Sequence, residues 1–202
     1  MLLRVFPAWL ASLLLFSGTA AAASNCPQGQ YPICLGSCFC VEDPNQVIGP
    51  AYESATLMAA STLEEQLRQS RDRAIQAGTN PMPAAIRQQL LPYYDSQLLD
   101  MARYRVGNGE ELDLAGTMLQ NPDIQAVTLI DIVIFRSEQD AQDNLALWAH
   151  ELWHVQQYRD WGVHDFALRY TRDFNAVETP AYQIQARVRT AARQQLGAQT
   201  AP

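Results

Sequence analysis

The sequence predicts an α+β domain that is mainly helical and carries one small sheet. Two observations lead to this fold class. Apolar residues recur at roughly helical spacing through 51–77 and again in the C-terminal third of the chain. Two short segments between them, 101–106 and 126–135, have the alternation or the β-branched composition of strands. Strands that are grouped together, with helices before and after them, are typical of α+β domains.

The first 23 residues have the pattern of a secretory signal peptide. Arg4 gives a positive start, residues 5–16 are apolar, and small residues up to Ala23 suit a cleavage site. The apolar run is short for a membrane-spanning helix, and no later stretch is long and apolar enough to span a bilayer. We therefore expect an exported protein, periplasmic or secreted, with no integral membrane segment after cleavage. The alternative is a lipoprotein attached at Cys26, although Asn25 stands where such a motif has a small residue.

Residues 24–50 are expected to form an irregular N-terminal arm that disulfides hold in place. All four cysteines lie there, at Cys26, Cys34, Cys38 and Cys40. An exported chain meets oxidising conditions, so two disulfides are expected. Three pairings are possible, and a bridge from Cys38 to Cys40 is the least favourable because one intervening residue would strain it. The alternative is a four-thiolate zinc site, but the usual C-x2-C pairs are missing.

Length and charge limit the remaining possibilities. Residues 51–202 are enough for a single domain with a substantial core. The formal charge of −7 and the absence of a basic cluster argue against nucleic acid as a partner. Nothing in the sequence indicates an oligomeric state.

Four elements are expected before the strongest strand. Their ranges are helix 51–77, helix 83–91, strand 101–106 and helix 110–120. The Gly- and Pro-rich segment 78–83 should end the first helix. Pro83 suits the first turn of the second, because a helix leaves that backbone position without a hydrogen-bond partner.

The segment AVTLIDIVIF, residues 126–135, predicts the strongest strand in the chain. It is apolar and β-branched along nearly its whole length. Asp131 interrupts it. This side chain either faces outward from an exposed sheet or supports a functional site.

Two long helices are expected after this strand. Ser137 and Asp140 form a variant of the capping box at the start of the first. Gly162 should end that helix. The predicted order is a helix to about Trp161, a loop that contains His164 and Asp165, and a helix from about Phe174 to Ala192.

The motif HELWH, residues 150–154, lies within the first of these helices. His150 and His154 are one turn apart, so both imidazoles can bind a single ion. Glu151 lies beside the open coordination position, where it can take a proton from zinc-activated water. The alternative is an ordinary helix that carries two histidines on one solvated or packed face.

A catalytic zinc site needs a third protein ligand. Glu178 lies on the last helix, and antiparallel packing of the two helices would bring it opposite His154. Its other interpretation is a surface glutamate near a helix start, where the helix dipole favours an acid. His164 is a second candidate, although the longer pattern H-E-x-x-H-x-x-G-x-x-H fails here. The remaining candidates are Asp160, Asp165 and Asp173.

A peptidase also needs a donor for the oxyanion that forms when water attacks. Tyr182, Tyr170 and His164 are the candidates, and Tyr182 is one turn after Glu178. The simpler interpretation of each tyrosine is aromatic packing.

Four stretches between Pro83 and Tyr182 resemble a bacterial family. They are PAAIRQQL from Pro83, LLDMARYRV from Leu98, AVTLIDIVIF from Ala126 and WAHELWHVQQY from Trp148. In this order they are similar to a zincin-like family of unknown function, described as a core metallopeptidase-like domain associated with extracellular contractile injection systems. The resemblance covers about half of the chain, and its most specific part is the H-E-L-x-H-V-x-Q segment.

This resemblance implies a zincin-like fold with one Zn²⁺ per chain. It implies His150 and His154 as ligands and Glu151 as the general base. Glu178 resembles the downstream glutamate ligand of the glutamate-type zincins, the class that includes thermolysin. Those enzymes have an aspartate one turn later, where this chain has Tyr182.

The partner that orients a zinc-binding histidine must then come from elsewhere. Asp131 or Asp173 could serve. The residues and the resemblance together predict an exported zinc metalloendopeptidase that acts on peptide or protein substrates. One alternative is a non-catalytic, zinc-stabilised binding or assembly module of the cell envelope. Another is a helical domain without a metal.

Overall fold

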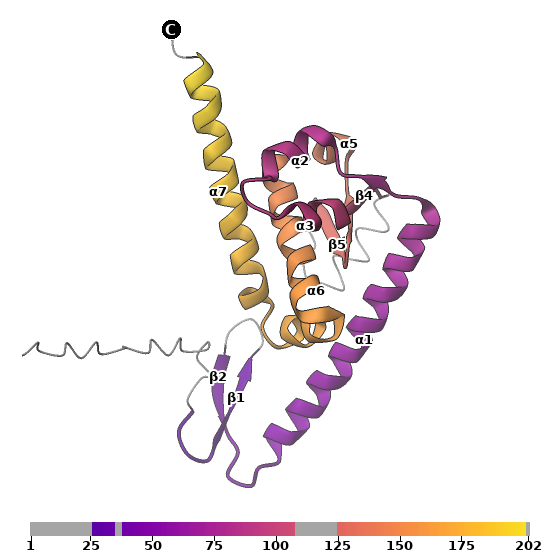
Figure 1. The fold of residues 1–202 in the computed structure, drawn as a ribbon. Helices are drawn as coiled ribbons and strands as arrows, with labels where there is room; N and C mark the ends of the chain where they lie inside the picture. The colour runs from indigo at the N-terminus through magenta and orange to yellow at the C-terminus, as the bar shows by residue number, and fades with distance from the viewer. Residues whose placement is uncertain (1–25, 35–37, 108–124, 201–202) are drawn as a thin grey trace, which may run out of the picture.

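The computed structural model of the protein describes residues 26–34, 38–107 and 125–200 (Figure 1). The elements are β1 (Gln30–Cys34), β2 (Cys38–Glu42), α1 (Ile48–Ala77), β3 (Asn80–Pro81), α2 (Ala84–Leu90), α3 (Ser96–Met101), β4 (Arg103–Val106), β5 (Ala126–Leu129), β6 (Ile132–Phe135), α5 (Glu138–Asp143), α6 (Leu145–Arg172) and α7 (Phe174–Thr200). Long helices with small sheets confirm the predicted α+β class. The predicted signal peptide, 1–23, and the predicted helix 110–120 lie outside the described residues. Within the described ranges, no helix has the length and apolar character needed to cross a membrane.

The N-terminal arm is a hairpin rather than an irregular segment. Strands β1 and β2 pair antiparallel from Gln30 opposite Glu42 to Cys34 opposite Cys38. The two disulfides that were predicted are present and join Cys26 to Cys40 and Cys34 to Cys38. Because all four sulfurs are in these bridges, the alternative interpretation of the cysteines as a four-thiolate zinc site is wrong.

Helix α1 begins at Ile48, three residues before the predicted start, because Asp43 caps it. One carboxylate oxygen of Asp43 accepts hydrogen bonds from the backbone N–H groups of Val47 and Ile48 at 2.7 and 3.0 Å. The other oxygen accepts from Gly49 at 2.8 Å. Side-chain oxygens that satisfy the first N–H groups of a helix fix where it starts. At the other end Gly78, with φ +92°, stops α1 as predicted.

The segment between α1 and the sheet contains a helix that the sequence analysis missed. The predicted helix 83–91 is α2. After it, the Asp95 carboxylate accepts a hydrogen bond from Leu98 N at 2.8 Å and caps α3. Helix α3 takes up Met101, so the predicted strand 101–106 begins at Arg103 as β4.

The main sheet has the order β3-β4-β6-β5, and only the β4–β6 pair is parallel. Strands β5 and β6 are buried on both faces. Val133 and Phe135 belong to one apolar cluster, whereas Ile132 and Ile134 belong to the other. Strands covered on both faces are apolar along their whole length, which explains the sequence of this segment.

The prediction of one strand over 126–135 is wrong, because the chain turns at Ile130 and Asp131 to form a hairpin. Ile130 has φ +64°, a conformation that two-residue hairpin turns usually give to glycine or asparagine. The Asp131 carboxylate is paired with Arg71 of α1, through Nε at 2.6 Å and Nη2 at 2.9 Å. Asp131 therefore ties the turn to α1, and neither faces outward from a sheet nor supports the HELWH motif.

The start of the long helical region is confirmed in part. The Ser137 hydroxyl accepts a hydrogen bond from Asp140 N at 3.0 Å, as the capping box predicts. This helix, α5, ends after six residues, at Asp143. Asn144 then caps α6 by accepting from Leu147 N at 3.1 Å.

The prediction of a loop after Gly162 is wrong. Gly162 has φ +80° and interrupts α6, but residues 163–172 continue as helix. His164 and Asp165 lie on the exposed side of that helical segment. Helix α7 starts at Phe174 as predicted and extends to Thr200, beyond the predicted end at Ala192.

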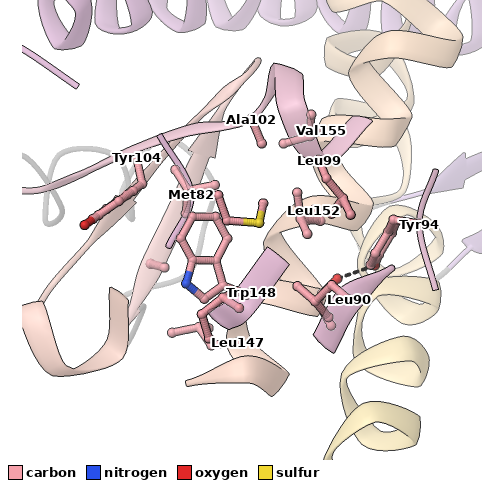
Figure 2. Packing of buried hydrophobic residues seen from close by; sticks show 14 of the residues in the cluster. Met82, Leu90, Tyr94, Leu99, Ala102, Tyr104, Leu147, Trp148, Leu152 and Val155 are labelled. Carbon is pink, nitrogen blue, oxygen red and sulfur yellow. Dashed lines mark hydrogen bonds between the residues drawn. The ribbon is translucent and has the colours of Figure 1, made fainter. Parts of the chain in front are cut away.

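Helix α6 lies between α1 and α7 and supplies the centre of the core (Figure 1). Figure 2 shows Trp148, Leu152 and Val155 of α6 packed with residues of α2 and α3. Tyr94 fixes this contact by donating a hydrogen bond to the Ala149 carbonyl. The helix that carries the HELWH motif is thus held on several sides.

Replacement of Leu152 by Ala should lower the free energy of unfolding by about 2–5 kcal/mol, because it leaves a cavity in this core. Leu152 is 0% exposed and directly follows Glu151. Urea unfolding of the two proteins measures the difference. Leu57→Ala is the matched control, because Leu57 is 46% exposed. Similar losses at both positions would contradict the packing described.

Candidate metal centre

Helix α6 buries three polar side chains of the HELWH motif. His150, Glu151 and His154 are all buried, although buried polar groups are stable only when they have partners. Figure 1 shows α7 running back alongside α6. This antiparallel arrangement brings Glu178 of α7 to the two histidines, as the sequence predicted.

The three side chains form a nearly equilateral triangle of possible ligand atoms. His150 Nε2 lies 3.2 Å from His154 Nε2. Glu178 Oε2 lies 3.3 Å from His150 Nε2 and 3.4 Å from His154 Nε2. A tetrahedral ion with bonds of about 2.0–2.1 Å holds its ligand atoms about 3.3–3.4 Å apart. The geometry and the two imidazoles with one carboxylate therefore fit a metal ion, and the donor set is one that zinc accepts.

Gln157 and Tyr170 hold two of these side chains from outside the triangle. Gln157 Oε1 lies 2.8 Å from His154 Nδ1, and Gln157 Nε2 donates to the Val177 carbonyl at 2.9 Å. The Tyr170 hydroxyl donates to Glu178 Oε1 at 3.1 Å, which leaves Oε2 facing the histidines. Within the described part of the chain, His150 Nδ1 has no hydrogen-bond partner.

The prediction that Asp131 or Asp173 orients a zinc-binding histidine is wrong. Asp131 is paired with Arg71, and Asp173 accepts a hydrogen bond from Ala176 N at 3.1 Å at the start of α7. Gln157 occupies this position instead, and the sequence analysis missed it. Its position three residues after His154 on the same helix is a signal that could have found it.

Glu151 is held from the sheet. The Thr128 hydroxyl of β5 lies 2.8 Å from Glu151 Oε2 and 3.1 Å from the Glu151 carbonyl. Both residues are buried. Thr128 thus fixes the carboxylate beside the histidines, and no sequence signal pointed to this residue.

The environment sets the charge of the carboxylate in the triangle. Burial alone would raise the pKa of Glu178, but the hydrogen bonds with His150 and His154 outweigh it and lower that pKa. For His154, burial lowers the pKa, but the interactions with Glu178 prevail and raise it. Burial, with Glu178 nearby, also raises the pKa of Tyr170, so its hydroxyl keeps its proton and donates. Glu178 is therefore ionised, as a metal ligand must be.

The triangle lies at the wall of a pocket of about 170 Å³. The pocket is lined by Gln125, Ala126, Val127, Thr128, Leu147, His150, Glu151, His154, Phe166, Tyr170, Glu178, Tyr182 and Gln185. The Tyr182 ring centroid lies 4.6 Å from that of His150, and Tyr182 is 52% exposed. Tyr182 is therefore accessible from the pocket, whereas Tyr170 is engaged with Glu178.

The other candidate ligands lie elsewhere. His164 Nδ1 is 2.9 Å from Glu64 of α1 on the surface. Asp160 pairs with Arg159 at 3.0 Å, and Asp165 is exposed. None of these side chains lines the pocket. The structure thus brings together Glu178, Tyr170 and Tyr182 with the motif, and it places His164 apart from it.

Comparison with known protein families gives a match to part of the chain. Residues 81–162 match the family described as the eCIS core domain. The match covers less than half of the chain, includes the whole HELWH motif and ends before Glu178. It supports a relation to the family that the four sequence stretches resemble. Neither the curated proteins nor the solved structures include a match to this chain.

Proposed function

We propose that the protein is an exported zinc-dependent metallopeptidase. The observation that carries this proposal is the triangle of His150, His154 and Glu178 beside the buried carboxylate of Glu151. Two ligands and a base on one helix, with a third ligand from a neighbouring helix, is an arrangement that suits metal-assisted hydrolysis.

Each residue has a defined task in this reaction. His150, His154 and Glu178 would hold the zinc, which when bound acidifies water and polarises a carbonyl group. Glu151, fixed by Thr128, takes the proton from the attacking water and passes it to the leaving amine. Tyr182 donates a hydrogen bond to the oxyanion from the exposed side of the pocket.

The sheet edge beside the pocket is a further reason to propose that the substrate is a peptide. Among the described strands, β5 is at the edge of the sheet and pairs with β6 alone. Residues 125–128 line the pocket. An extended peptide that adds to such an edge uses backbone hydrogen bonds, whatever its side chains are. We infer that the substrate binds along β5, with its scissile carbonyl at the triangle.

Two further observations support the proposed location of the protein. Disulfides persist in oxidising compartments, so Cys26–Cys40 and Cys34–Cys38 fit a periplasmic or extracellular protein. The match to the eCIS core domain supports an association with contractile injection systems. We propose that the protein acts in the cell envelope or outside the cell in that association.

A second function is a zinc-stabilised assembly module without catalysis. It is favoured by the origin of the ligands, because α6 and α7 both contribute and a bound ion would join them. The folding energy of such a module would come partly from the metal. Chelation should then lower the melting temperature, with no cleavage of any peptide.

Elemental mass spectrometry of the purified mature protein tests the metal centre. We expect about one zinc per chain after gentle dialysis, because three protein ligands complete a catalytic zinc site. His150→Ala combined with His154→Ala is the negative control and should retain none. A wild-type protein that holds no zinc and takes up none on addition would contradict both functions.

Cleavage of a broad peptide library then separates the two functions. A peptidase should cleave, stop after chelation and resume when zinc is returned. Zinc at full occupancy without cleavage of any peptide would favour the assembly module.

A further inference from the structure

We propose that Gln157 is a positioning residue for two metal ligands: its carboxamide oxygen holds His154 directly, and its carboxamide nitrogen holds the backbone carbonyl of Val177, the residue before Glu178. The inference rests on the proposed metal centre. Gln157 is 4% exposed, so its carboxamide has exchanged water for protein partners on both sides. Those partners are His154 Nδ1 at 2.8 Å and the Val177 carbonyl at 2.9 Å.

The chemistry of these two contacts fixes the direction of each hydrogen bond. A backbone carbonyl only accepts, so the Gln157 group that faces Val177 must be the amide nitrogen. The amide oxygen therefore faces His154, and because it only accepts, His154 Nδ1 must carry the proton. In the neutral imidazole, the form that binds a metal, the lone pair of His154 is then on Nε2, the atom that lies in the triangle. Gln157 thus selects the tautomer in which His154 can bind a metal.

The second contact acts on the start of α7. Val177 directly precedes Glu178, and its carbonyl is anchored to α6 by Gln157. Pro180 lies inside α7 and has no N–H, so the helical hydrogen bond to the Ala176 carbonyl is missing. The first turn of α7 therefore depends more on contacts from outside the helix. Gln157 supplies one of them and fixes Glu178 relative to His154.

A carboxylate could not serve both contacts. Carboxylates commonly orient zinc-binding histidines, and a glutamate at position 157 would still accept the proton of His154 Nδ1–H. Its other oxygen would face the Val177 carbonyl, and two acceptors repel each other. A carboxamide offers an acceptor and a donor on one rigid group, whereas an ionised carboxylate offers acceptors alone. The two-sided role therefore predicts that Gln157→Glu weakens the site, whereas a role toward His154 alone predicts equal or tighter binding.

Zinc affinity, measured by competition with a chromophoric chelator at fixed pH, tests this. We expect Gln157→Leu to weaken binding by about 10–100-fold, the usual loss when an orienting partner is removed. Gln157→Glu should also bind more weakly than wild type. Gln156→Leu is the matched control, because Gln156 is the neighbouring residue on α6 and only half-buried, and it should bind as wild type does. Thermal unfolding of each metal-free variant verifies that it folds.

A second measurement needs no variant. Nitrogen NMR of the zinc-loaded wild type should show His154 protonated at Nδ1 and bound to the metal through Nε2. Binding through Nδ1 would overturn the inference, even if the variants failed to fold.

The other outcomes are also decisive. Wild-type affinity in Gln157→Leu would overturn the inference and leave the proposed function intact. If Gln157→Glu bound zinc as tightly as wild type or more tightly, the contact of Gln157 with α7 would not contribute to zinc affinity, and the two-sided role would be overturned. A wild-type protein without zinc would overturn the inference and the proposed function together.

Discussion

Replacement of Glu151 by Gln should leave zinc in place and lower peptide hydrolysis by about 10²–10⁴-fold, the contribution of a general base. Glu151 is not one of the three ligands in the triangle. Glutamine has nearly the same size, and its carboxamide oxygen can still accept the hydrogen bond from Thr128, which is 2.8 Å long in the wild type. What the amide cannot do is take a proton from water. Steady-state kcat/KM on one cleaved peptide, with zinc content measured on the same samples, gives the comparison.

Glu138→Gln provides the control for the chemical change itself, because Glu138 is exposed on α5. It should retain full activity. Turnover at the wild-type rate in a zinc-loaded Glu151→Gln protein would contradict the role of Glu151 as base. Full zinc content with strongly reduced turnover would separate the peptidase from the assembly module, since the latter has no turnover to lose.

Features that depend on neighbouring residues could be predicted from the sequence. The stop of α1 at Gly78 and the cap at Ser137 follow from local backbone chemistry, and both are present. The pairing of His150 with His154 is set by one turn of helix. The position of Glu178 required one further assumption, the antiparallel packing of two long helices, which the structure confirms.

The turn at Ile130 was not predicted, because Asp131 is a single turn-favouring residue within an otherwise apolar, β-branched run. A β-branched residue rarely adopts a positive φ, and the apolar run continues on both sides of it. The conformation is held by tertiary contacts. Arg71 of α1 binds the Asp131 carboxylate, and Arg103 N donates to the Asp131 carbonyl at 2.8 Å.

The helix after Gly162 was missed for a different reason. Gly162 ends one helix with a positive φ, as a stop signal should. Apolar residues then resume at helical spacing, at Val163, Phe166, Ala167 and Tyr170, and all are buried in one cluster. The polar side chains His164 and Asp165 suggested a loop, but they are the solvent face of this helical segment. The consequence for the site is direct, because Phe166 and Tyr170 line the pocket.

The two residues that hold the site in place, Gln157 and Thr128, are uncharged, and for this reason they were not predicted from the sequence. Aspartates were the expected partners of the histidines, since carboxylates usually fill that position. Here a carboxamide does so, and a threonine hydroxyl from a strand 23 residues away holds Glu151. Neutral hydrogen-bonding residues are common throughout a sequence, so only their location in the fold distinguishes these two.

Replacement of Glu178 by Gln should weaken zinc binding by more than about 100-fold, because loss of a partner outside the coordination shell already costs about 10–100-fold. The amide keeps the shape of the side chain and can still accept the hydrogen bond from Tyr170. It removes the negative charge that faces the two histidines at 3.3 and 3.4 Å. Chelator competition measures the affinity, and hydrolysis should fall together with zinc occupancy.

Glu64→Gln is the matched control, because Glu64 also pairs with a histidine, His164 on the surface, at 2.9 Å. It removes the same charge from the same kind of contact without touching the triangle, so zinc affinity should stay at the wild-type value. Equal zinc affinity in the two variants would mean that Glu178 is not a ligand. A carboxylate whose pKa is lowered by both histidines would then be a structural partner of the imidazoles, and the third ligand would have to be another group.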